Sequence, residues 1–309
     1  MDIDLVYLWV NGNDPEWIAK RDACIGRPSG KQENCKGRYV DSGDLKYSLR
    51  SIEKYAPWIH KIFIVTDNQV PEWLDTTNPK VQIVDHKEIM PAESLPCFNS
   101  ALIEHFLDRI PGLSEHFLYA NDDMYINQPV SPSTFFKADG LPILYMNWKP
   151  FRKLALMYRE KWLGKTLSVY LKTIKNSAEL IEKYYGTYYG CKQHHNIDAY
   201  LKSTITFTNQ KFEQEFRPMF SHHVRSAEDL QRCIYSYVAL AEKKGHLRYV
   251  SQNHSFRLHI DNHKLYEKFE RKNPVLFCMN DSEHANDDDR KCAIEFVKKL
   301  FPNKSQFEK

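Results

Sequence analysis

The chain has 309 residues, of which 42% are hydrophobic, and its formal net charge at pH 7 is +3. This length is sufficient for one large α/β domain with a packed core. The small net charge and the lack of a nucleic-acid-binding motif argue against a DNA- or RNA-binding protein. The sequence has neither an apolar run of about 18 residues nor a recognisable signal peptide, so we expect a cytoplasmic protein without a transmembrane helix.

The seven cysteines, at positions 24, 35, 97, 191, 233, 278 and 292, form no Cys-x-x-Cys pair. An odd and scattered set is typical of reduced thiols, although a Cys24–Cys35 disulfide is an alternative. Cys191 lies close to His194 and His195 in the sequence, but no second pair of ligands follows at the spacing of a zinc site. We therefore do not predict a zinc site there.

Apolar runs and amphipathic segments alternate over residues 1–150. Strands are predicted at residues 3–10, 62–65, 81–84 and 117–120, and helices from Asp44 and from Asn99 or Ser100. The Gly- and Lys-rich segment 26–43 is predicted to be a mobile loop. This alternation predicts a Rossmann-like, mostly parallel sheet flanked by helices. Several strands end in polar or acidic residues, so we expect these side chains to gather along one edge of the sheet.

Asp122 and Asp123 follow the last of these strands directly and are the most informative feature of the chain. Ligands of open α/β sheets bind just beyond the carboxyl ends of the strands. Two carboxylates at such a place are suited to hold Mg²⁺ or Mn²⁺ against a diphosphate. The alternative is a solvated turn, which is the usual explanation of an isolated Asp-Asp pair.

Residues 150–210 are rich in Tyr, Lys, Leu and Trp at helical spacing, and they predict a helical subdomain inserted before residues 190–309 of a single domain. Basic and aromatic side chains alternate near its start, namely Lys149, Arg152, Lys153 and Lys161 with Trp148, Phe151, Tyr158 and Trp162. This pattern suits either solvated helix faces or an element that binds an acceptor or a membrane surface. Further helices are predicted over residues 225–245 and 290–300.

Four separated blocks of the sequence are more specific in combination than any one of them alone. They are Ile3–Asp14; Arg38 to Asp123 with Leu45–Glu53, Ala56–Trp58 and Ile64–Thr66; His195–Asp198 with Phe220 and Val224–Gln231; and Asn280–Asp281 with Leu300–Ser305. In this order they resemble the Stealth family. Its members are sugar-1-phosphate transferases of microbial capsule synthesis, related to the catalytic core of the animal N-acetylglucosamine-1-phosphotransferase.

The resemblance implies a glycosyltransferase-A-like fold and transfer of a hexose-1-phosphate, such as N-acetylglucosamine-1-phosphate, from a UDP-sugar to a hydroxyl of a glycan acceptor. The products would be a phosphodiester and UMP, in capsular or exopolysaccharide synthesis. The implied partners are a nucleotide-sugar donor and an oligosaccharide or polysaccharide acceptor. The implied location is the bacterial cytoplasm, and association with the inner membrane surface or a capsule-assembly complex is left open.

The third block supplies the predicted catalytic residues. A histidine titrates near neutral pH, so the resemblance suggests His195 as the general base for the acceptor hydroxyl. Asp198 follows three residues later, and we predict that it orients His195 from the same helical face. Arg225 is predicted to bind phosphate oxygens with its planar guanidinium. The alternative for Arg225 is a surface ion pair with Glu228 or Asp229.

The donor and metal sites are predicted from position within the blocks. The donor nucleotide and diphosphate are assigned to residues after the first strand and on the two predicted helices: Trp9, Asn11, Gly12, Asp14, Arg50, Asn99, Ser100 and Glu104. The metal is assigned to four oxygen-bearing residues: Asp122, Asp123, Asn280 and Asp281. Trp9 can instead fill the core, and Arg50 can instead cap the sheet edge.

Several alternatives are open at this point. The animal relatives carry an extra His and Pro before the reactive histidine, where this chain has Lys192-Gln193-His194, so His194 is a second candidate for the base. A metal-dependent glycosyltransferase would attack the anomeric carbon and release UDP, and a glycan-binding protein would catalyse nothing. The sequence does not reveal the sugar, the nucleotide, the acceptor linkage or the oligomeric state.

Overall fold

The computed structural model describes residues 1–26, 36–282 and 284–309. Cys35, and with it the alternative Cys24–Cys35 disulfide, lies outside the described residues, as does half of the predicted loop 26–43. Eleven strands are described: β1 Ile3–Leu8, β2 Ile62–Thr66, β3 Val81–Asp85, β4 His116–Asn121, β5 Met124–Ile126, β6 Ile143–Asn147, β7 Lys192–Gln193, β8 Asp198–Leu201, β9 His246–Tyr249, β10 Ser255–His259 and β11 Leu276–Asn280.

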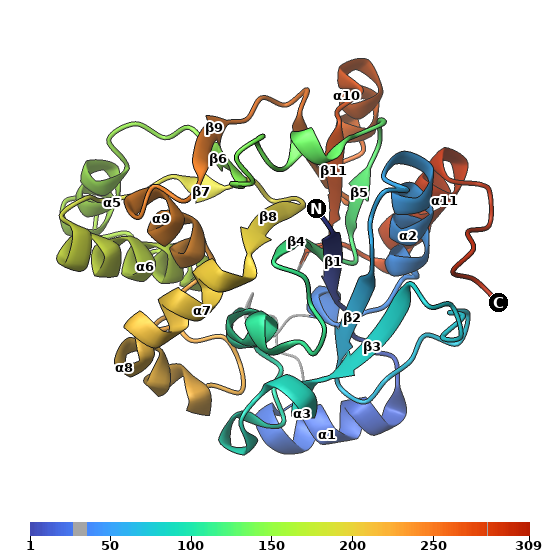
Figure 1. Ribbon diagram of the computed structural model, residues 1–309, viewed down its shortest axis with the longest axis horizontal. Coiled ribbons are helices and arrows are strands. Elements are labelled where there is room, and N and C mark those ends of the chain that lie inside the picture. Colours follow the sequence, from blue (N-terminus) through green and yellow to red (C-terminus); the bar gives the residue numbers. More distant parts are fainter. Residues whose placement is uncertain (27–35, 283) are drawn as a thin grey trace.

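The main sheet has the strand order β3-β2-β1-β4-β8 (Figure 1). All neighbouring strands in it are parallel except β4 and β8. The predicted mostly parallel sheet is therefore confirmed, although its edge strand β8 comes from residues 198–201 and not from residues 1–150. Two smaller sheets have the orders β10-β11-β5 and β7-β6-β9.

The α-helices of the described residues are α1 Pro15–Ile25, α2 Asp44–Tyr55, α3 His86–Ile89, α4 Ser100–Ile103, α5 Arg152–Lys161, α6 Val169–Tyr185, α7 Lys202–Lys211, α8 Glu213–Phe216, α9 Cys233–Ala241, α10 Lys264–Lys272 and α11 Asp287–Leu300. The helix predicted from Asp44 is confirmed as α2. The helix predicted from Asn99 or Ser100 is a single α-helical turn, α4, continued by the 3-10 helix η4 (Glu104–Arg109). Among the described residues, no helix has both the length and the apolar character needed to cross a membrane.

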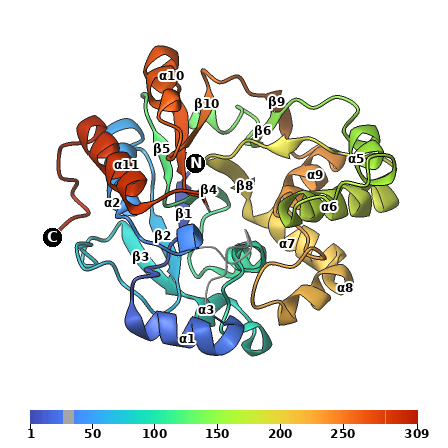
Figure 2. The same ribbon diagram turned by 180° about the vertical axis from the view of Figure 1, so that it is seen from behind.

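The main sheet is buried on both faces, as expected for a parallel sheet covered by helices. Side chains alternate along each strand, so that Leu5 and Tyr7 of β1 pack with Leu45 and Leu49 of α2, whereas Val6 joins the opposite cluster. That second cluster contains residues of η4, α6, α7 and α9. Figures 1 and 2 show α2 and α11 on one side of the sheet and α6, α7 and α9 on the other.

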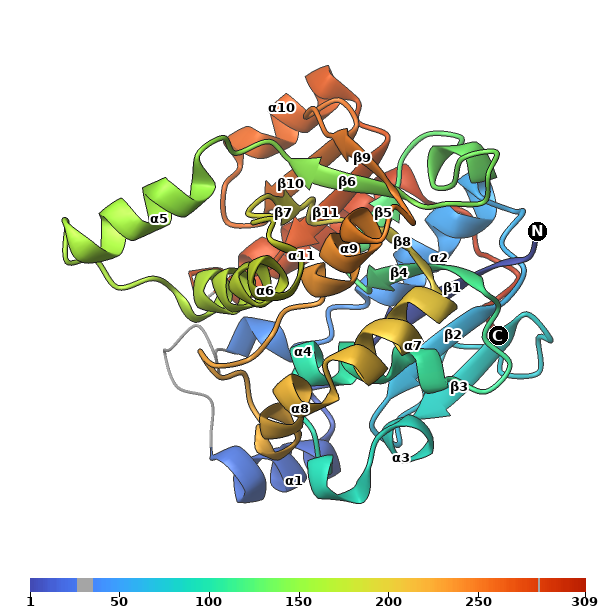
Figure 3. The same cartoon turned by 60° about the vertical axis from the view of Figure 1, so that its left-hand side comes forward.

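Residues 150–210 are helical only in part. α5 and α6 confirm the predicted helices, but β7, β8 and nearly all of α7 follow within the same stretch. Figure 3 shows α5 extending away from the rest of the chain. The turn Asp122-Asp123 links β4 of the main sheet to β5 of the second sheet, which brings β11 beside it.

Candidate active site

A cavity of about 770 Å³ opens at the carboxyl ends of the parallel strands. Its wall includes residues at or just beyond the ends of β1 to β4, among them Trp9, Asp67, His86, Asp122 and Asp123. β1 lies between β2 and β4, so the strand order of the sheet changes direction at β1. Ligands of α/β sheets bind at such a switch point. The expectation that polar strand ends gather along one edge is confirmed.

Asp122, Asp123 and Asp44 of α2 line this cavity together. Burial raises the pKa of Asp123 to about 6 and that of Asp44 to about 7, and the charge of Asp123 adds to the latter shift. The pKa of Asp122 is raised well above its ordinary value by burial, and then by the charges of Asp123, Asp44 and Asp41. Carboxylates that raise one another's pKa in this way favour a bound cation.

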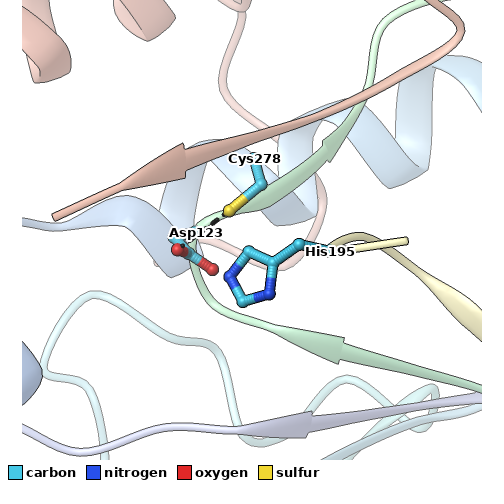
Figure 4. Close-up of side chains that lie close together, drawn as sticks. All are labelled: Asp123, His195 and Cys278. Atoms are coloured by element: carbon cyan, nitrogen blue, oxygen red, sulfur yellow. Dashed lines mark hydrogen bonds between the residues drawn. The ribbon is translucent and has the colours of Figure 1, made fainter. Parts of the chain in front are cut away.

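Asp123 also forms a cluster with His195 and Cys278, whose ligand atoms all lie within 4.8 Å of one another (Figure 4). The Cys278 thiol donates a hydrogen bond to Oδ2 of Asp123 over 3.1 Å, and burial raises the pKa of this thiol well above its usual value. Oδ1 of Asp123 is buried and has no hydrogen-bond partner among the described residues. This orphaned oxygen has lone pairs available, so a divalent metal ion fits the site.

His195 lies in the bend between β7 and β8. Its pKa is lowered well below the usual value by burial, and then by the positive charges of Arg257, Arg232 and Arg225. The imidazole is therefore neutral at pH 7, and one ring nitrogen has a lone pair that can accept a proton or bind a metal.

His194, the second candidate for the base, is already engaged. Its side chain is 1% exposed, Nδ1 lies 2.9 Å from Ser255 Oγ, and Nε2 donates to the carbonyl oxygen of Ile197 over 3.1 Å. Both histidines line the cavity, but only His195 joins Asp123 in the cluster. The geometry therefore favours His195.

The prediction that Asp198 and His195 share a helical face is wrong, because Asp198 is the first residue of β8 and His195 precedes this strand in a bend. Oδ2 of Asp198 accepts a hydrogen bond from Arg232 over 2.7 Å, and Oδ1 lies 3.2 Å from Nε2 of His194. Arg232 also pairs with Glu104 at 3.3 Å. Asp198 thus holds Arg232 and His194 in place.

Cationic side chains share the cavity with the carboxylates: Lys192, Arg225, Arg232 and Arg257. Arg225 donates a hydrogen bond to Oγ of Ser100. In the described structure, Arg225 forms no ion pair with Glu228 or Asp229, and Asp229 instead lies 2.6 Å from His222. Arg225 is thus placed where it can contact an anionic ligand in the cavity.

Three of the residues predicted to bind the donor, Trp9, Ser100 and Glu104, line the cavity. Asn11, Gly12, Asp14 and Asn99 are not part of its described wall. They support it, as Asn99 shows by capping α4 and donating to Asp229 Oδ2 over 2.9 Å, next to the segment that carries Arg225.

The loop after β1 is held by local contacts. The Gln69 side chain bonds the backbone of Asn11 and donates to Oδ2 of Asp14 over 2.9 Å. A Cβ atom on Gly12 would lie 1.9 Å from the carbonyl oxygen of Tyr39, so only glycine allows this close approach. In the structure, Asn11, Gly12 and Asp14 therefore shape the loop that carries Trp9 into the cavity wall.

Arg50, which is predicted to reach the donor diphosphate, is engaged away from the cavity in this structure. Its guanidinium forms a two-pronged pair with Glu308, with distances of 2.7 and 2.8 Å, and donates to the carbonyl oxygen of Phe301 over 3.0 Å. Arg50 is absent from the described wall of the cavity. It attaches the C-terminal segment to α2.

Asn280 is the last residue of β11 and Asp281 follows it; both line the cavity, but both are engaged by arginines. Oδ1 of Asn280 accepts from Nε of Arg257 over 3.0 Å, and Oδ2 of Asp281 lies 2.7 Å from Nε of Arg290. Their role as metal ligands stays a prediction.

Comparison with known proteins was made by sequence and by structure. Residues 1–27 match the family model of Stealth protein CR1, conserved region 1, and residues 38–144 match that of Stealth protein CR2, conserved region 2. The capsular polysaccharide phosphotransferase fcs1 of Haemophilus influenzae is 34% identical over 92% of this chain and 79% of its own length. The chain belongs to the Stealth family. This family assignment makes it a transferase.

Other relatives align over different shares of their length. The receptor polysaccharide phosphotransferase WefC of Streptococcus gordonii is 32% identical over 99% of this Stealth protein and 98% of its own chain. The exopolysaccharide phosphotransferase cps2G of Lactiplantibacillus plantarum is 52% identical, over 46% of this chain and 41% of its own. Among solved structures, the galactosyltransferase LgtC covers 97% of this chain and 95% of its own, with 10% identity and a TM-score of 0.46.

The structure adds four residues to the site of this Stealth protein that the sequence did not reveal: Asp44, Arg232, Arg257 and Cys278. From the sequence, Asp44 is predicted only to begin a helix. Arg257 and Cys278 lie on β10 and β11, which pair side by side, and β11 also pairs with β5, the strand that follows Asp123. No local pattern in the sequence predicts such a contact.

Proposed function

We propose that this Stealth protein transfers a hexose-1-phosphate, such as N-acetylglucosamine-1-phosphate, from a UDP-sugar to a hydroxyl group of a glycan acceptor. UMP is released, and the product is a phosphodiester of capsular or exopolysaccharide synthesis. The observation that carries the proposal is the cluster of Asp123 with the neutral His195, in the same cavity as Arg225. The relatives named above, which are polysaccharide phosphotransferases, support the same class of reaction.

In the proposed reaction, His195 accepts the proton of the acceptor hydroxyl. The hydroxyl oxygen forms a bond to the phosphorus next to the sugar, and the bond from this phosphorus to the bridging oxygen breaks. UMP leaves with that electron pair. Arg225 stabilises the charge on the phosphoryl oxygens, which is the main contribution that a protein makes to phosphoryl transfer.

Asp122 and Asp123 are proposed to hold Mg²⁺ or Mn²⁺, because carboxylate oxygens suit these ions and the Cys278 thiol is protonated. When bound, such an ion neutralises negative charge on the diphosphate. Asn280 and Asp281 are proposed as further contacts of the ion or the diphosphate from the wall that they occupy.

The test is to identify the nucleotide released from UDP-sugars with Mg²⁺ and short glycan acceptors. We expect UMP, together with a new phosphodiester in the glycan. Release of UDP would overturn the proposal in favour of a glycosyltransferase that attacks the anomeric carbon, and glycan binding without turnover would favour a binding protein. D123A and H195A should each lower turnover at least a thousandfold. D139A and H246A, which alter an exposed Asp–His pair outside the described cavity wall, are the matched controls.

We also propose that the protein works at the inner membrane surface, with α5 in contact with the lipid. The side of α5 that faces the protein consists of the buried Leu156 with the partly buried Arg152 and Glu160. At about 100° per residue, Leu154 and Tyr158 project from the opposite side of the helix. The apolar face of α5 is therefore the outer one, in contrast to an ordinary surface helix.

The exposed residues around α5 suit an anionic membrane better than a glycan. Large apolar side chains are 40–80% exposed over this stretch, namely Trp148, Phe151, Leu154, Met157, Tyr158, Trp162 and Leu163. Aromatic rings also stack on sugars, but Leu154, Met157 and Leu163 gain little from a glycan and gain from acyl chains. The exposed Arg159, Lys161 and Lys165 complement anionic headgroups.

A further inference from the structure

A group of cations borders a second, smaller hollow at the base of α5. Its wall consists of Asn147, Trp148, Lys149, Arg152, Leu171, Lys192 and Val250. Lys192 and Leu171 also belong to the wall of the main cavity, so the two spaces adjoin. Pairing of Asn147 on β6 with Lys192 on β7 fixes Lys192 beside the segment that carries Lys149.

Within the described part of the chain, Lys149, Arg152 and Lys192 have no acidic partner. Among the residues that the structure describes, neither Lys149, Arg152 nor Lys192 forms an ion pair, whereas the neighbouring Lys153 pairs with Glu182 at 2.6 Å. Nε of Arg152 is buried and finds no hydrogen-bond acceptor in the described part of the chain. A buried donor without a partner is unfavourable and indicates that a ligand supplies the acceptor.

The packing around Arg152 is tight. A Cβ atom on residue 190 would lie 2.9 Å from both Cβ and Cγ of Arg152, so Gly190 lets the stem of the arginine side chain approach the backbone. The positive charge of Lys192 is unfavourable in the folded state, since burial and then the charges of Arg152, Arg257 and Lys149 lower its pKa to about 8. Uncompensated positive charge held in fixed positions is the property of an anion site.

We propose that this hollow binds a phosphate or phosphodiester group of the acceptor, while the acceptor hydroxyl lies in the main cavity. The inference rests on the proposed function and specifies its acceptor as anionic. Each transfer leaves a phosphodiester in the product, so a glycan extended by repeated transfer carries one at a fixed distance from its reactive end. A phosphorylated lipid carrier offers the same chemistry. The planar guanidinium of Arg152 suits hydrogen bonds to phosphate oxygens, and the ammonium groups of Lys149 and Lys192 act as point charges that attract the phosphate.

The test measures binding without turnover. A short glycerol phosphodiester oligomer is titrated into the full chain by calorimetry, with excess Mg²⁺ and UDP to fill the donor site. We expect K149A, which alters an exposed side chain, to weaken binding about threefold, and K149A/R152Q to weaken it at least tenfold. The control R271Q/K272A removes two exposed cations from the end of α10, outside the described walls of both cavities, and should stay within twofold of the unmodified protein.

Equal losses in K149A/R152Q and R271Q/K272A would show unspecific attraction. Unchanged binding of K149A/R152Q to both the soluble oligomer and vesicles that contain a polyprenyl phosphate would show that the phosphate binds elsewhere. Either result overturns the inference. A parallel titration with vesicles that contain a polyprenyl phosphate distinguishes the two sources of phosphate. A loss confined to the vesicles assigns the hollow to a lipid carrier, and a loss with the soluble oligomer assigns it to the glycan.

Failure of the proposed function is separable from failure of this inference. D123A should abolish transfer but leave binding of the oligomer unchanged. In the transfer assay, K149A/R152Q should lower kcat/KM at least tenfold for a phosphodiester acceptor and leave kcat/KM unchanged for an uncharged acceptor of the same length. An equal loss with both acceptors would overturn the assignment of the hollow.

Discussion

Replacing Asp44 by Asn is expected to stabilise the metal-free protein above neutral pH and to flatten the pH dependence of its stability. Asp44 is the first residue of α2, and its Oδ1 accepts a hydrogen bond from the Tyr125 hydroxyl over 2.7 Å. Burial raises its pKa from 3.8 to about 7, and the charges of Asp123, Asp41 and Asp281 contribute to the shift. Asparagine keeps the acceptor oxygen and removes the charge.

The sign and size follow from proton linkage. Between pH 3.8 and about 7, folded Asp44 keeps a proton that the unfolded chain has released, so stability falls as the pH rises through this window. A shift of about three units at about 1.4 kcal/mol each costs the folded state about 4 kcal/mol above this window. The helix dipole of α2 stabilises the charged form of Asp44 by about 0.5 kcal/mol. D44N should therefore gain about 3 kcal/mol at pH 8 and almost nothing at pH 4.

Urea unfolding in EDTA between pH 4 and pH 8 measures this gain. D288N is the matched control, because Asp288 also lies in the first turn of a helix, α11, but its side chain is 89% exposed. Added Mg²⁺ should stabilise the unmodified protein more than D44N, since a cation near Asp44 relieves the same repulsion. A D44N protein no more stable than its parent at pH 8, or one with the parent's pH slope, would refute the reasoning.

Three other outcomes test the structural assignments. R50Q should lower the free energy of unfolding by about 2 kcal/mol, because the Glu308 side chain is 2% exposed and loses the two-pronged pair with Arg50, keeping Lys46 at 3.5 Å and Ser305 as partners, while the donor KM stays unchanged. A raised KM would place Arg50 in the donor site. G12A should lower the unfolding free energy by about 2 kcal/mol or more, because its Cβ would lie 1.9 Å from a carbonyl oxygen, and urea unfolding at the stability of the parent would contradict that packing. Replacing Phe151 and Trp162, 80% and 78% exposed, by serine should weaken sedimentation with anionic vesicles at least tenfold without a change in Tm; equal sedimentation would exclude α5 as the contact.

Local patterns in the sequence predicted the features that local structure decides. Apolar runs marked the strands of the main sheet, and the residues at their ends had to meet at one edge because the strands are parallel. Asp122 and Asp123 were found in this way, and so was Trp9. The helix α2 was found from its apolar face, but the partner of Arg50 was not, because Glu308 lies 258 residues further along the chain.

The prediction for Asp198 failed for a related reason. A spacing of three residues places two side chains together only within a helix, and the segment 198–201 pairs with β4 as a strand. Its carboxylate is therefore directed to Arg232, a residue 34 positions away. The site is complete only when β8, β10 and β11 are in place, and these are fixed by strand pairing over long distances in the sequence.

The charges in the cavity differ in how far the folded chain compensates them. Arg232 has Asp198 and Glu104 as partners, so its charge is balanced without a ligand. Among the described residues, Asp123 and Lys192 have no ion-pair partner, so their charges are not balanced, and burial is the main cause of the raised pKa of the one and the lowered pKa of the other. Balanced pairs contribute to folding or positioning, whereas unbalanced charges lower stability unless a ligand of opposite charge is bound. The unbalanced carboxylates and cations are therefore the groups expected to bind the metal ion and the phosphates, and Arg232 is expected to position its neighbours.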